Sequence, residues 1–337
     1  MTSDRKPSAV IISDREPGLP FSKGLMASRV MVTGLSAFRA YQVAERVEQI
    51  LLEWGRPSVT NRELTAVAVQ VLGEVAGDRY AKNFVRWQQV ERLDVPLVIL
   101  IGGATGVGKS TIATQLAARL GIVRVVATDA IREVMRAMFS KELMPTLHTS
   151  SFDAGTALRD PAVRGTEAVI AGFREQTDAV VVGLNAFLER AAVEGTSVII
   201  EGAHVVPGFV DLEPWEGRFL GIPVVITVED DDVHRSHFAV RSSDMPSRPA
   251  ERYAKGFSNI RRIQKFIRSQ ALSHGVPIIP NYSLDQAIAA VVDLVVEKAT
   301  GHAAAEEGAA PEATGHTVRL ESTEDQAAVA MTEGRSR

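Results

Sequence analysis

Residues 1–93 carry apolar positions mostly at helical spacing. After a short strand-like run at 9–13, apolar residues recur every three or four positions over 37–54, which predicts an amphipathic helix. Thr60 precedes Glu63 by three positions, a capping-box pattern that predicts the start of a second helix. A third helix is expected over 78–93. These elements predict a small, mainly helical amino-terminal domain.

The pattern changes at Leu97, where five consecutive apolar residues extend to Ile101. An all-apolar run of this length is typical of a strand buried on both faces of a parallel sheet. A helix over 110–120 and a second apolar strand over 123–127 follow. Alternation of strands and helices predicts a three-layer α/β/α fold, in which helices cover both faces of a mostly parallel sheet. Further elements are expected at 131–139, 166–194, 197–200, 224–228 and 277–279.

The last segment differs in composition from the rest of the chain. From residue 301 it consists mainly of Ala, Glu, Gly, Thr and Ser, with very few large apolar residues to offset the entropy of ordering. We therefore expect a disordered tail over 301–337, a main domain over 94–300 and a helical module over 1–93.

Composition narrows the location and the partners. No apolar run approaches the roughly 20 residues that a membrane helix needs, and the first residues lack the apolar core of a secretory signal. We expect a soluble, cytoplasmic protein with no membrane partner. The chain has no cysteine, its seven histidines form no HxxxH pair, and its net charge is -4. Zinc and nucleic acid are therefore not expected as partners, and the sequence leaves a homo-oligomer undecided.

The segment from Gly103 to Ser110 matches the G-x-x-x-x-G-K-S pattern of a phosphate-binding loop. Its glycines let successive backbone amides face one anion, and the helix that follows adds its own free amides. Lys109 should reach the β and γ phosphates of ATP, and Ser110 should ligate Mg²⁺. A glycine-rich turn without nucleotide is the weaker alternative, because the loop stands between a strand and a helix. The expected nucleotide-binding residues are Gly103, Ala104, Thr105, Gly106, Val107, Gly108, Lys109, Ser110 and Thr111.

Two acidic residues follow predicted strands, at the sheet edge where ligands collect in α/β proteins. Asp129 comes after the strand over 123–127 and could accept the proton of a substrate hydroxyl or hold Mg²⁺. Its structural alternative is the N-cap of the next helix. Glu201 ends the strand at 197–200, at a position that helps to hold Mg²⁺ in other P-loop enzymes, although a cap is again the alternative.

Several cations could bind an acidic substrate or the transferred phosphate. Arg132 and Arg136 lie one turn apart on the helix after Asp129, where they either face the substrate or form a solvated surface. His204 could contact a substrate phosphate, but a lone histidine is more often structural.

The segment 232–255 is rich in arginine and histidine within an acidic protein. We interpret it as a lid, in which Arg241 and Arg248 would neutralise charge on the transferred group. An ordinary solvated helix and loop is the alternative. The sequence also lacks the NKxD motif by which GTPases read guanine. The phosphate-binding loop and the α/β pattern together predict a P-loop NTPase fold, and the missing motif favours a metabolite kinase over a GTPase.

The runs 101–113 and 120–136 closely resemble the 2-phosphoglycerate kinases, and so do 143–152 and 200–208. This resemblance spans roughly residues 10–300 and implies transfer of the γ-phosphate of ATP to the 3-hydroxyl of 2-phosphoglycerate. The products would be 2,3-bisphosphoglycerate and ADP. It also implies that substrate binds Asp129, Arg132, Arg136, His148 and His204. Kinases of 3-phosphoglycerate or an inositol phosphate are the nearest alternatives. A nucleotide-switched binding protein and a polynucleotide kinase are alternatives of other classes.

The amino-terminal module resembles an ATP-cone, the nucleotide-sensing domain of ribonucleotide reductases. The likeness rests on the segments 20–23 and 80–87, whereas 13–18 departs from the usual turn. A purely structural helical cap is the alternative to a regulatory nucleotide site.

Overall fold

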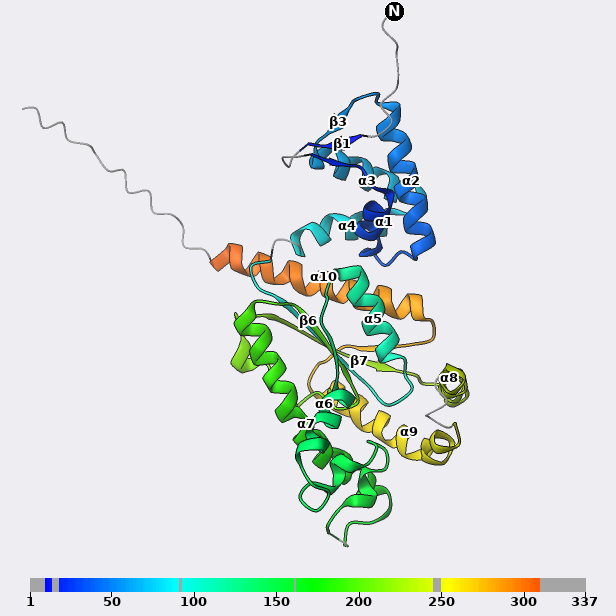
Figure 1. Ribbon diagram of the computed structural model, residues 1–337, viewed down its shortest axis with the longest axis vertical. Helices are drawn as coiled ribbons and strands as arrows, with labels where there is room; N and C mark the ends of the chain where they lie inside the picture. The colour runs from blue at the N-terminus through cyan, green and yellow to red at the C-terminus, as the bar shows by residue number, and fades with distance from the viewer. Residues whose placement is uncertain (1–9, 14–17, 91–92, 161, 245–249, 310–337) are drawn as a thin grey trace, which may run out of the picture.

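The computed structural model describes residues 10–13, 18–90, 93–160, 162–244 and 250–309 (Figure 1). The turn at 14–17, Arg248 and the segment 310–337 therefore lie outside the described residues. No helix among the described residues is long and apolar enough to cross a membrane.

The amino-terminal module combines helices with a small sheet. Thr60 and Glu63 form the predicted capping box: the Thr60 hydroxyl accepts from the Glu63 amide at 3.2 Å, and the Glu63 carboxylate accepts from the Thr60 amide at 2.9 Å. Strand β1 pairs antiparallel with β2 and parallel with β3. The elements are β1 (Ile11–Ile12), β2 (Leu19–Pro20), α1 (Lys23–Met31), α2 (Ala37–Glu53), β3 (Ser58–Val59), α3 (Asn61–Val75) and α4 (Asp78–Val90).

The main domain contains a five-stranded parallel sheet in the order β5-β6-β4-β7-β8, which confirms the predicted α/β fold. The all-apolar strand β4 lies at its centre, as a strand buried on both faces must. The register sets Ile101 of β4 and Ala127 of β5 beside Glu201 of β6, all at the carboxyl edge. The strands are β4 (Leu97–Gly102), β5 (Val125–Ala127), β6 (Val198–Gly202), β7 (Leu220–Thr227) and β8 (Ile278–Pro280).

Alternate residues of β4 belong to different cores. Ile99 and Ile101 join the core with α5 and α10, whereas Val98 and Leu100 join the core with α7. Side chains alternate along a strand, so this division shows the three-layer arrangement. The helices of the main domain are α5 (Lys109–Leu120), α6 (Thr128–Met138), α7 (Gly165–Glu194), α8 (Asp231–Asp244), α9 (Ala250–Ser273) and α10 (Leu284–Ala309). Short 3-10 helices span Pro145–His148, Ala154–Ala157 and Glu213–Trp215.

Helix α10 lies between the module and the sheet (Figure 1). Arg79 and Asn83 of α4 both reach Asp293 of α10, the first in an ion pair and the second through a hydrogen bond of 2.6 Å. The apolar core is continuous from the module into the main domain. The proposed division into domains and the ATP-cone likeness stay predictions.

Two sequence expectations need correction. Helix α6 begins at Thr128 and its N-cap is Ala127, so Asp129 lies in the first turn and does not cap the helix. The strand ends at the sheet edge and the helix starts without a linker. The tail does not begin at 301, because α10 continues to Ala309. Ala and Glu are strong helix formers, and here they extend a helix that is already nucleated by packing.

Candidate active site

The segment Gly103 to Ser110, which we call the nucleotide loop, joins β4 to α5. Gly103, Gly106 and Gly108 have φ angles of 140°, 87° and 91°, a region that residues with a side chain rarely adopt. Gly108 is the N-cap of α5, and no side chain caps this helix start. The free amides and the positive end of the helix dipole fit an anion such as a nucleotide phosphate.

Lys109, Ser110 and Glu201 come together beside this loop. The Lys109 ammonium donates to the Ala104 carbonyl at 2.8 Å, and the Ser110 hydroxyl donates to the Glu201 carboxylate at 2.8 Å. Glu201 is buried at the end of β6. A hydroxyl and a carboxylate at hydrogen-bond distance are suitable ligands for Mg²⁺, directly or through water. They line a small space of about 40 Å³, the loop cavity, with Thr105, Lys109, Ala127, Asp129, Gly202 and Ala203.

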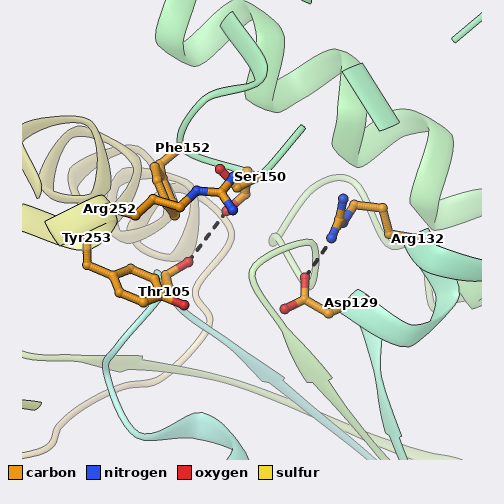
Figure 2. Close-up of a pocket in the computed structure, with 8 residues that line it drawn as sticks. Thr105, Asp129, Arg132, Ser150, Phe152, Arg252 and Tyr253 are labelled. Carbon is orange, nitrogen blue, oxygen red and sulfur yellow. Dashed lines mark hydrogen bonds and ion pairs between the residues drawn. The ribbon is translucent and has the colours of Figure 1, made fainter. Parts of the chain in front are cut away.

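A second cavity, the arginine-lined cavity, has a volume of about 140 Å³ (Figure 2). Asp129 and Thr105 line both cavities. Figure 2 shows Asp129 and Arg132 on one side, facing Arg252 and Tyr253 across the space. The Asp129 side chain is 62% exposed, so its carboxylate is open to a ligand. The other lining residues are Ser150, Ser151 and Phe152.

Arg132 is held by the loop that follows α6. Its guanidinium donates to the carbonyls of Leu147 and Thr149 at 3.0 and 2.8 Å. Its Nε is buried, has no hydrogen-bond partner, and lies 3.9 Å from Asp129 Oδ1. The guanidinium also pairs with Glu133 at 2.8 Å, so Arg132 contributes positive charge to the cavity wall while most of its N–H groups are already bonded.

His204 lies behind this cavity and does not line it. Its Nε2 donates to Gln176 Oε1 at 2.9 Å, and its Nδ1 accepts from the Thr128 hydroxyl at 3.0 Å. This tautomer follows from Gln176, whose Nε2 donates to the carbonyls of Thr146 and Thr149. Burial lowers the pKa of His204 to about 4, so the ring is neutral. Sequence reasoning missed Gln176, since a glutamine in a long helix gives no signal.

The remaining predicted residues are placed elsewhere. Arg136 pairs with Glu133 on the surface of α6, and the His148 Nε2 donates to the Phe139 carbonyl at 2.9 Å. Neither residue lines either cavity, because Arg136 is paired within α6 and His148 is bonded to the carbonyl at the end of that helix. Thr111 lies in the first turn of α5, outside both cavities.

The described part of the segment interpreted as a lid belongs to α8 and to the start of α9. Arg241 belongs to α8, but its side chain, like all of Arg248, lies outside the described residues. Their catalytic role stays a prediction. Helix α8 packs directly on the nucleotide loop, where Phe238 contacts Gly106. Arg252 and Tyr253 of α9 line the arginine-lined cavity; both lie in the segment interpreted as a lid, although only Arg241 and Arg248 were expected to act on the transferred group.

The chain is similar to known proteins over most of its length. A family model described as an AAA domain matches residues 98–208, which include the nucleotide loop. A 2-phosphoglycerate kinase from Thermococcus kodakarensis is 42% identical over 85% of this chain and 96% of its own length. A 2-phosphoglycerate kinase from Pyrococcus furiosus is 40% identical over 86% of this chain and 93% of its own length. One from Methanothermobacter thermautotrophicus is 38% identical over 83% of this chain and 92% of its own length. Identities of this size over most of both chains show that the protein belongs to the 2-phosphoglycerate kinase family.

Proposed function

We propose that the protein transfers the γ-phosphoryl group of ATP to the 3-hydroxyl of 2-phosphoglycerate, forming 2,3-bisphosphoglycerate and ADP. One observation carries the proposal: the loop cavity and the arginine-lined cavity meet at Thr105 and Asp129. Phosphoryl transfer needs the donor phosphate and the acceptor hydroxyl next to each other with little covalent chemistry from the protein. Two adjoining cavities with one shared carboxylate meet that need.

The acceptor side supplies both charge and size selection. Arg132 and Arg252 line it, and they suit a substrate that carries a carboxylate and a phosphate. Its volume of about 140 Å³ is well below the roughly 300 Å³ at which drug-sized pockets begin, which favours a phosphorylated three-carbon acid over a polyphosphorylated ring. In this proposal Asp129 accepts the proton of the attacking hydroxyl.

The donor side fits Mg²⁺ and ATP. Bound Mg²⁺ would neutralise charge on the β and γ phosphates. Ser110 and Glu201 would hold it, and Lys109 would move from the Ala104 carbonyl to the phosphates. The loop amides bind the phosphates.

An acceptor screen tests the proposal. Release of ADP from Mg·ATP is measured with 2-phosphoglycerate, 3-phosphoglycerate, glycerate and inositol phosphates, and the product is identified by phosphorus NMR. We expect 2-phosphoglycerate to give the highest kcat/KM, and Lys109→Ala to abolish this turnover. Faster turnover of another acceptor would overturn the substrate assignment while leaving a kinase. Slow hydrolysis that no acceptor accelerates would point instead to a nucleotide-switched binding protein.

A further inference from the structure

Four consecutive carbonyls of the nucleotide loop each accept a hydrogen bond from a side-chain N–H. The distances lie between 2.8 and 3.0 Å. Three of the four donors come from outside the loop: two imidazoles of α8 and one amide that follows β8. The pairs are Lys109 with Ala104, His234 with Thr105, His237 with Gly106, and Asn281 with Val107.

These contacts have a consequence for anion binding. A loop that presents its amides to a phosphate must direct its carbonyls away from that phosphate. Buried carbonyls need partners, and a partner that fixes a carbonyl also fixes the amide at the other end of the same peptide plane. Donors on the outer side of the loop therefore determine whether its amides converge.

Helix α8 and Asn281 approach the loop more closely than any side chain would permit. A Cβ at Gly106 would lie 2.3 Å from the Phe238 ring, and one at Gly108 would lie 2.5 Å from Asn281 Nδ2. The glycines thus serve a second purpose besides their φ angles, because they let the donors reach the backbone.

The tautomer of His234 is fixed by its neighbours. Its Nε2 donates to the Thr105 carbonyl at 2.9 Å, and its Nδ1 faces the Arg261 guanidinium at 3.4 Å. Arg261 is itself held by the carbonyls of Val228 and Glu229. Burial lowers the pKa of His234 to about 4, which keeps the ring neutral and leaves Nδ1 as an acceptor.

We propose that His234 and His237 of α8 are positioning residues, which hold the nucleotide loop in its ATP-binding shape through the carbonyls of Thr105 and Gly106. Helix α8 then sets the affinity for ATP by way of the loop. The proposal rests on the ATP-binding part of the proposed function and is independent of the acceptor.

His237 offers the cleaner test because it is only half-buried. His237→Leu removes the donor, whereas His237→Asn retains an N–H at the position of Nδ1. Calorimetric titration with Mg·ATP should give a Kd raised about tenfold for His237→Leu and changed by less than about twofold for His237→Asn. Without nucleotide, both variants should melt within about 2 °C of the wild type. His274→Leu, an exposed imidazole bonded to the Gln270 carbonyl, is the control and should bind normally.

His234→Gln and His234→Leu form a second pair, since the glutamine Nε2 can replace the imidazole Nε2. Unchanged Mg·ATP affinity in His237→Leu would overturn the proposal, and so would an equal loss in His237→Asn. Normal ATP binding by the wild type without turnover of 2-phosphoglycerate would defeat the substrate assignment alone. Turnover of 2-phosphoglycerate together with unchanged ATP affinity in His237→Leu would defeat the positioning role alone.

Discussion

The two halves of the site are built differently. The nucleotide loop is one continuous segment between β4 and α5, and its turn follows from its own glycines, although donors of α8 and Asn281 hold its carbonyls. The arginine-lined cavity draws its walls from four separate segments: Thr105, the start of α6, the loop 150–152 and the start of α9. The first half therefore has a local signature in the sequence, whereas the second is assembled only when distant segments pack together.

The two halves of the site share a similar support and one residue. Each is backed by a buried, neutral imidazole, His204 behind the arginine-lined cavity and His234 behind the nucleotide loop. Thr105 belongs to both halves, because its carbonyl accepts from His234 and its hydroxyl lies 3.5 Å from the Ser151 hydroxyl. A change in one half should reach the other mainly through this residue.

Asp129→Asn should give the largest difference between the effect on turnover and the effect on ATP binding. Loss of the base should reduce kcat about a thousandfold, while the Kd for Mg·ATP changes by less than about threefold. Steady-state kinetics and calorimetry measure the two effects. Asp178→Asn, an exposed position on α7, is the matched control and should retain full activity. Unchanged turnover would remove Asp129 from the catalytic residues.

The buried imidazoles predict a loss of stability in acid. Both have pKa values lowered from 6.5 to about 4, so below pH 6.5 the unfolded chain binds protons that the native state does not. The free energy of unfolding should fall by about 2 kcal/mol for each imidazole between pH 7 and pH 5. Chemical denaturation at both pH values measures this. His204→Asn should remove one of the two contributions, whereas the exposed His274→Asn should leave the pH dependence unchanged.

Gln176→Met tests the arginine-lined cavity without changing the nucleotide loop. It removes the donor to the carbonyls of Thr146 and Thr149 and leaves His204 Nε2 without an acceptor, which should cost about 2 kcal/mol of stability. The KM for 2-phosphoglycerate should rise while the Kd for Mg·ATP stays close to the wild-type value. Gln70→Met, at an exposed pair with Glu74, is the control. An equal loss of ATP affinity would show that the halves are not separable.

Arg252→Met should have the smallest effect. Its side chain lines the arginine-lined cavity and also forms an ion pair with Asp153 at 3.4 Å. Its removal should raise the KM for 2-phosphoglycerate about tenfold with little change in the KM for ATP. Arg190→Met, an exposed residue of α7 paired with Glu194, serves as the control. A larger effect on ATP than on the acceptor would assign Arg252 to the nucleotide half.

Features with a local cause could be predicted from the sequence. The run from Leu97 to Ile101 predicted a buried strand, the Thr60 capping box predicted a helix start, and the glycines of the nucleotide loop predicted its turn. Each depends on residues that are neighbours in the chain, so a pattern within a few positions contains the information. The parallel sheet followed from the alternation of strands and helices.

What brings distant residues together was decided by the tertiary structure. Arg252 and Tyr253 meet Asp129 only because α9 packs beside the sheet edge, and His237 reaches Gly106 only because α8 lies on the loop. No spacing along the chain predicts these contacts, since they depend on how whole helices pack. The sequence alone therefore determined the P-loop and the fold class, whereas packing of α8, α9 and the loop 146–152 decided the shape of the acceptor side and which cations face it.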